Sequence, residues 1–152
     1  MFYTFVCPSL SVSEAVNYCD MPIVYLLDLD AALRDALRRL MESVGLSART
    51  FTDLETFLMA YQPEHPACLL LDIRIPGRHQ LSAQQDLREC GVDLPVIVMT
   101  HHSNVAMAVA VMKQGAMDFL EKSINDQMLL DCVHHAVAED RSRRRAQAQR
   151  RG

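Results

Sequence analysis

Three absences constrain the class of protein. No apolar run in the 152 residues is long enough to cross a bilayer. Residues 1–20 contain no Lys or Arg, so they lack the charged start of a secretory signal. The five cysteines are odd in number and never form a Cys-x-x-Cys pair, which favours reduced thiols over a disulfide framework. We therefore expect a cytoplasmic protein that makes no contact with a membrane.

Acidic side chains are missing from the end of the sequence. From Arg141 onward there are six arginines and no Asp or Glu, whereas the rest of the chain has nine Lys and Arg against nineteen Asp and Glu. An arginine run of this kind usually forms a solvated helix end or a linker. The acidic remainder disfavours binding to duplex DNA.

The length and the half-apolar composition fit one domain with an ordinary core. A strong strand pattern begins two residues after Met21, while the residues before it show little periodicity. We predict an N-terminal extension over residues 1–20, a folded domain over 21–140 and an Arg-rich tail over 141–152. Two interpretations of the extension stay open: Met21 is the native start, or residues 1–20 form a loosely attached arm.

Hydrophobic periodicity alternates between strand and helix along the folded domain. The strand patterns cover Ile23–Leu27, Arg49–Phe51, Ala67–Leu71, Val96–Thr100 and Asp118–Leu120. The helix patterns cover Leu33–Val44, Leu54–Tyr61, Leu81–Cys90, Val105–Gln114 and Gln127 to roughly Arg145. Regular alternation predicts an α/β fold with a parallel, doubly wound sheet and helices on both faces. Among such folds we expect the flavodoxin-like strand order 2-1-3-4-5.

Polar residues stand where four of these strands end. Asp72 ends an apolar run just before a Pro-Gly turn, Asp28 follows the first strand, and Thr100 and Lys122 close the fourth and fifth. Parallel strands end at one edge, so the four side chains should converge at a crevice. Two carboxylates can hold Mg²⁺, while an ammonium and a hydroxyl can bind a phosphoryl group. Each residue alone could be structural, but together they predict phosphoryl transfer to a carboxylate.

Four motifs resemble one known family. Val24–Asp28, Leu69–Gly77, Pro95–Thr100 and Met112–Lys122 are similar, in order and spacing, to the receiver domain of bacterial two-component response regulators of the FixJ type. The resemblance covers about Met21 to Arg145. It implies a phosphoacceptor at Asp72, an acidic Mg²⁺ pocket at Asp28 and Asp72, phosphate-stabilising Thr100 and Lys122, and a switch aromatic at Phe119.

The same resemblance implies a signalling module rather than an enzyme, with at most its own phosphorylation and dephosphorylation as chemistry. A sensor histidine kinase is the implied phosphodonor. The surface formed by the helix at 105–114, the strand at 118–120 and the last helix is the implied site of a phosphorylation-dependent homodimer. No helix-turn-helix follows in the given sequence, so we expect no DNA binding by this chain and interpret residues 141–152 as a linker remnant.

Three positions depart from the family pattern. Leu29 stands where a second acid is usual, so an expected metal ligand is missing and a weakened Mg²⁺ site is predicted. Asp30 could compensate, but its position before an Ala-Ala-Leu helix start favours an N-cap. Ser123 replaces the usual cis proline, which predicts a trans bond and a less well aimed Lys122. The segment Arg78-His79-Gln80 replaces small residues, with an effect that the sequence does not predict.

These departures keep two further hypotheses open. The chain could be an atypical receiver that binds partners without phosphorylation. Alternatively, Asp28 and Asp30 resemble the Asp-x-Asp motif of haloacid dehalogenase phosphatases, although Ala32 occupies the expected Thr position. In that family Asp28 would be the nucleophile. The length leaves no room for the cap domain that such enzymes carry.

Two other patterns have competing interpretations. The helix at 105–112 is apolar all round, so Ala106 and Ala110 either leave an apolar outer face for a partner or simply complete a covered core helix. The adjacent pairs His101-His102 and His134-His135 lack partners at metal-ligand spacing, which favours solvated histidines over a metal site.

Overall fold

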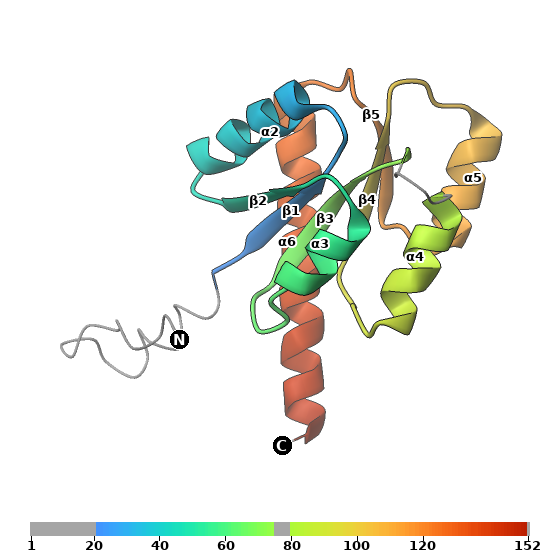
Figure 1. Ribbon diagram of the computed structural model, residues 1–152. Coiled ribbons are helices and arrows are strands. Elements are labelled where there is room, and N and C mark those ends of the chain that lie inside the picture. The colour runs from blue at the N-terminus through green and yellow to red at the C-terminus, as the bar shows by residue number, and fades with distance from the viewer. Residues whose placement is uncertain (1–20, 75–79, 152) are drawn as a thin grey trace.

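The computed structural model describes residues 21–74 and 80–151 as one five-stranded parallel sheet between two layers of helices (Figure 1). The strands are β1 (Ile23–Leu27), β2 (Ser47–Phe51), β3 (Ala67–Asp72), β4 (Val96–Thr100) and β5 (Asp118–Glu121). The helices are α2 (Ala31–Ser43), α3 (Leu54–Ala60), α4 (Gln80–Glu89), α5 (Val105–Lys113) and α6 (Asp126–Arg151). The predicted extension at 1–20 and the residues Arg78 and His79 lie outside the described residues.

The sheet has the predicted topology. Its strand order is β2-β1-β3-β4-β5, and every neighbouring pair is parallel. The flavodoxin-like fold is therefore confirmed. Its register also positions the site: Leu27 of β1 lies opposite Leu71 of β3, so the next residue of each strand, Asp28 and Asp72, comes level at the same edge.

The central strands are buried on both faces, which explains why they read as continuous apolar runs. In β1, Tyr25 and Leu27 belong to the apolar layer that includes residues of α3, α4 and α5, while Val24 and Leu26 belong to the layer that includes residues of α2 and α6. The same alternation holds in β3 and β4. Apolar layers thus pack on both faces of the central strands and keep the carboxyl ends of these strands in register.

Polar caps and glycines define the helix ends. The side chains of Asp30, Asp53 and Asn104 accept backbone N–H groups at the starts of α2, α3 and α5. Gly91 follows α4 with a φ of 77°. Glycine adopts this left-handed conformation without the steric strain that a Cβ atom would cause, so it commonly ends helices. The main difference from the sequence prediction is α6, which continues to Arg151 rather than ending near Arg145.

The three cysteines among the described residues are free thiols. Cys68 lies inside β3, and burial raises the pKa of its thiol to about 12. Within residues 21–74 and 80–151, no helix is long and apolar enough to cross a membrane.

Helix α6 runs from the carboxyl edge of the sheet to the opposite edge and projects beyond it (Figure 1). Buried Asp140 fixes it there. Its Oδ2 accepts the N–H of Ala67, the first residue of β3, at 2.8 Å and the Arg144 Nε–H at 2.8 Å. Arg143 bridges Asp140 and Asp93, and Arg144 also donates to the carbonyl of Pro63. Two arginines of the predicted tail therefore contact the domain body, although the predicted boundary itself stays a prediction.

Asp140→Ala should lower the free energy of unfolding by about 1–3 kcal/mol, because it leaves the buried N–H of Ala67 without its acceptor. Urea denaturation followed by circular dichroism measures this. Glu139→Ala, at an exposed position on the same helix, should change stability by less than about 0.5 kcal/mol. Equal effects of the two variants would contradict an anchoring role for Asp140.

Candidate functional site

Three charged side chains meet at the carboxyl edge of the sheet. The Lys122 Nζ lies 2.7 Å from Asp28 Oδ2 and 3.4 Å from Asp72 Oδ2. The side chain of Lys122 is 3% exposed, that of Asp28 6% and that of Asp72 0%. Two carboxylates and one ammonium are thus held together away from bulk water, because their residues lie at the carboxyl ends of β1, β3 and β5.

The two carboxylates differ in their hydrogen bonds. Asp28 Oδ1 accepts the N–H of Asp30 at 2.9 Å, and Asp72 Oδ1 accepts the N–H of Arg74 at 3.1 Å. Each Oδ2 forms an ion pair with the Lys122 ammonium. Within the described residues, the buried Asp72 Oδ2 and Lys122 Nζ have no hydrogen-bond partner beyond these ion pairs. Such groups are costly unless a further ligand binds them, so the arrangement suits an incoming oxygen-rich group.

Thr100 closes the site from β4. It is 5% exposed, and its Oγ1 donates to the carbonyl of His102 at 3.1 Å and accepts the His102 N–H at 3.3 Å. The hydroxyl is therefore engaged by its own loop. The Lys122 N–H donates to the Thr100 carbonyl at 2.7 Å, so the two residues are joined through the backbone of β4 and β5.

Phe119 lies one strand residue before the buried Leu120 and pairs in register with Val98. Its ring is partly buried and packs against the apolar layer beneath α3, α4 and α5. The structure therefore brings Asp28, Asp72, Thr100 and Lys122 to one edge, with Phe119 nearby on β5.

The positions after β1 explain which oxygens the site contains. Leu29 is half exposed and supplies no side-chain oxygen. Asp30 Oδ1 accepts the N–H groups of Ala32 and Leu33 at 3.0 and 3.2 Å. The prediction that Asp30 acts as an N-cap is confirmed, because its Oδ1 is bound to the first turn of α2.

The loop after β5 corrects one expectation. Cis peptide bonds are absent from the described residues, in agreement with a trans bond before Ser123. The expected loss of aim at Lys122 is wrong, however, because its Nζ lies between the two carboxylates. The backbone bond from Lys122 to Thr100 holds the strand end in place without a proline.

The donor set fits a divalent cation only loosely. Mg²⁺ takes one or two protein carboxylates and completes an octahedron with water and substrate oxygens. Asp28 and Asp72 meet that minimum, and Asp72 Oδ2 is free of hydrogen bonds. Leu29 removes a third ligand, and no cluster of three or more His, Cys, Asp or Glu suited to a metal occurs in residues 21–74 and 80–151.

Sequence reasoning missed two contacts around the site. The Arg34 Nη1 donates to the Asp28 carbonyl at 2.5 Å, and the Ser103 hydroxyl donates to Glu121. The bond from Ser103 also lowers the pKa of the Glu121 carboxyl. Arg34, the second residue of the helix predicted at 33–44, gave no signal in the sequence, because its reach toward β1 depends on how α2 packs.

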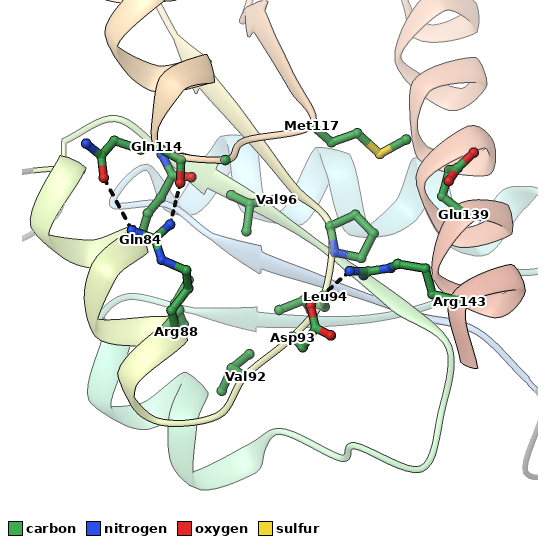
Figure 2. A pocket seen from close by; sticks show the side chains of 13 residues that line it. Gln84, Arg88, Val92, Asp93, Leu94, Val96, Gln114, Met117, Glu139 and Arg143 are labelled. Atoms are coloured by element: carbon green, nitrogen blue, oxygen red, sulfur yellow. Dashed lines mark hydrogen bonds and ion pairs between the residues drawn. The ribbon is translucent and has the colours of Figure 1, made fainter. Parts of the chain in front are cut away.

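A hollow of about 370 Å³ lies at the edge of the sheet opposite the charged cluster (Figure 2). Three of its four charged side chains are engaged within the fold: Arg143 pairs with Asp93 at 2.9 Å, and Arg88 donates to the carbonyl of Gln114. The four histidines of the two adjacent pairs are exposed, as expected of solvated residues. The chemistry-bearing groups are therefore those at the carboxyl edge.

Comparison with known protein families finds the response regulator receiver domain, matched over residues 24–134. The chain belongs to this family. The match includes β2 to β5, all of β1 except Ile23, and all three charged residues of the site. The family match favours a signalling receiver over both alternatives, the haloacid dehalogenase phosphatase and the phosphorylation-independent binding module.

Curated relatives of this receiver are longer proteins. Nodulation protein W of Bradyrhizobium diazoefficiens is 40% identical over 125 residues, which cover 82% of this chain and 55% of that protein. The transcriptional regulatory protein FixJ of the same species is 35% identical over 116 residues, covering 76% and 57%. The chain thus spans about half the length of the curated relatives it matches.

Solved structures give the same fold. The response regulator StyR has a TM-score of 0.78 at 35% identity, covering 86% of this chain and 66% of that one. Full-length FixJ from B. japonicum has a TM-score of 0.72 at 32% identity, covering 83% and 62%. A beryllofluoride-activated NtrC4 receiver domain dimer has a TM-score of 0.69 at 26% identity, covering 78% and 98%.

Asp72→Asn should raise the free energy of unfolding of the receiver by about 1 kcal/mol, because it removes one of two buried negative charges that share a single ammonium. Urea denaturation at pH 7 measures the change. Asp131→Asn, at an exposed position on α6, is the matched control and should leave stability unchanged. A clear loss of stability in Asp72→Asn would mean that the carboxylate stabilises the resting fold.

Proposed function

We propose that this receiver accepts a phosphoryl group on Asp72 from a sensor histidine kinase and passes the modified state to the surface of α5, β5 and α6. The single observation that carries the proposal is the buried Asp72 Oδ2, which accepts no hydrogen bond and faces the ammonium of Lys122 at 3.4 Å. A reactive carboxylate and a cation for the transferred group are thus already in place.

The geometry supports a simple displacement. Asp72 Oδ2 attacks the phosphorus of the donor, and the bond from phosphorus to the donor's leaving atom breaks, with the electron pair going to the leaving group. Lys122 stabilises charge on the phosphoryl oxygens through its ammonium, which already faces Asp72 Oδ2 at 3.4 Å. Thr100 can exchange its bond with the His102 carbonyl for one to the phosphoryl group.

Asp28 and Asp72 are the residues that would hold Mg²⁺. A bound divalent cation supplies positive charge to the phosphoryl oxygens during transfer. With Leu29 in place of a third oxygen ligand, we infer that the affinity of the site for Mg²⁺ is low.

The exposed face of α5 is the proposed output surface. Val105 is 80% exposed, Val109 46% and Met112 44%, so the apolar outer face comes from these three residues more than from Ala106 and Ala110. Contiguous exposed apolar side chains often mark an interface. The related NtrC4 receiver is a beryllofluoride-activated dimer by its name, and we propose a homodimer through the same surface here.

Incubation with acetyl phosphate should add one phosphate to the receiver, because Asp72 presents an unpartnered oxygen to the donor. Intact mass spectrometry detects the adduct. Asp72→Asn should abolish it, whereas Asp131→Asn should leave it unchanged. If the wild-type protein stays unmodified with both acetyl phosphate and a cognate kinase, the proposed function is contradicted. The remaining hypothesis would then be a receiver that binds partners without phosphorylation.

Phosphorylated receiver should elute as a dimer in size-exclusion chromatography with light scattering. Val109→Asp should keep it monomeric, because a charge would be buried at the proposed interface. Met59→Asp, 87% exposed on α3, adds the same charge elsewhere and should still dimerise. Dimerisation of Val109→Asp at wild-type concentration would place the interface on another surface.

A further inference from the structure

The resting pocket already contains its own cation. The Lys122 ammonium lies between Asp28 and Asp72, and all three side chains are at least 94% buried. The neighbouring charges are engaged elsewhere: Asp30 caps α2, Arg34 donates to the Asp28 carbonyl, and Glu121 accepts from Ser103. The pocket itself therefore holds two negative charges and one positive charge.

Lys122 also lies beside the oxygens that a metal ion needs. Asp28 Oδ1 is bound by the Asp30 N–H, and Asp28 Oδ2 lies 2.7 Å from the ammonium. Only Asp72 Oδ2 combines burial with the absence of a hydrogen bond among the described carboxylates of the pocket. A divalent cation would have to compete with the ammonium for the oxygens of both acids.

Leu29 makes that competition unequal. Mg²⁺ sheds its water shell reluctantly and binds well only where several oxygens replace it. Leu29 is half exposed beside the pocket and has no side-chain oxygen. A divalent cation would therefore find few ligands in the pocket and would be repelled by the buried ammonium.

We propose that Lys122 replaces the divalent cation as the counter-ion of Asp28 and Asp72, and that Leu29 sets this preference, so that phosphorylation of Asp72 depends only weakly on Mg²⁺. This inference rests on the proposed function for its catalytic consequence. Its structural part, the preference of the pocket for the ammonium over the metal, stands without any phosphoryl transfer.

Titration of the full chain with Mg²⁺, followed by NMR and without any phosphodonor, tests the structural part. Leu29→Asp should bind Mg²⁺ at least about tenfold more tightly than wild type, because it adds an anionic oxygen ligand. Lys122→Met should also tighten binding by about tenfold, because it removes a cation within 4 Å of both acids.

The chain offers matched controls. Lys113 is the only other lysine and is exposed, so Lys113→Met should bind Mg²⁺ like wild type. Met59→Asp adds a carboxylate on α3 and should also match wild type. If Lys122→Met does not fold, Lys122→Gln removes the charge and keeps N–H donors for Asp28. Wild-type affinity equal to that of Leu29→Asp, or no tightening in the folded Lys122 variant, overturns the proposal.

Phosphorylation by acetyl phosphate in Mg²⁺ and in EDTA tests the catalytic consequence. Adduct formation by wild type should slow less than about tenfold in EDTA, whereas Leu29→Asp should slow by more. Wild-type adduct that forms only with Mg²⁺ overturns the inference. Absence of any adduct in both proteins contradicts the proposed function instead, and the metal titrations then still decide the role of Lys122.

Discussion

The structure depends on one electrostatic compromise at the carboxyl edge of the sheet. Asp28 and Asp72 lie side by side because β1 and β3 are parallel and in register, and burial removes the water that would screen them. Lys122, carried by the end of β5, lies within 3.4 Å of both acids. Two carboxylates with one ammonium leave an excess negative charge in the resting pocket, which a bound cation would reduce.

The rest of the fold keeps this cluster assembled. Apolar layers on both faces of β1, β3 and β4 prevent the strands from slipping, and a slip of one residue would turn the acids away from each other. At the other end of β3, the N–H of Ala67 donates to Asp140 and so attaches this strand to α6. Helix α6 begins four residues after Lys122. One strand and one helix therefore connect the charged edge to the far edge of the domain.

Much of this arrangement could be predicted from the sequence. The bounds of β1 and β4 agree with the predicted strands, because continuous apolar runs closed by polar residues leave little ambiguity. The convergence of Asp28, Asp72, Thr100 and Lys122 followed from parallel topology alone. Other features lay beyond local patterns: Arg143 and Arg144 looked like solvated tail residues, yet they contact Asp93 and Pro63, which are distant in sequence.

The sequence by itself determined the fold class, the strand order and the set of polar residues at the strand ends, because hydrophobic period and chain order restrict how such a sheet can be built. Only the tertiary structure decided how those residues share their charges. The position of Lys122 between the two acids, the turn of Asp30 toward α2 and the pinning of α6 by Asp140 depend on distances between elements far apart in the chain. Such distances arise from packing, and no residue pattern along the chain encodes them directly.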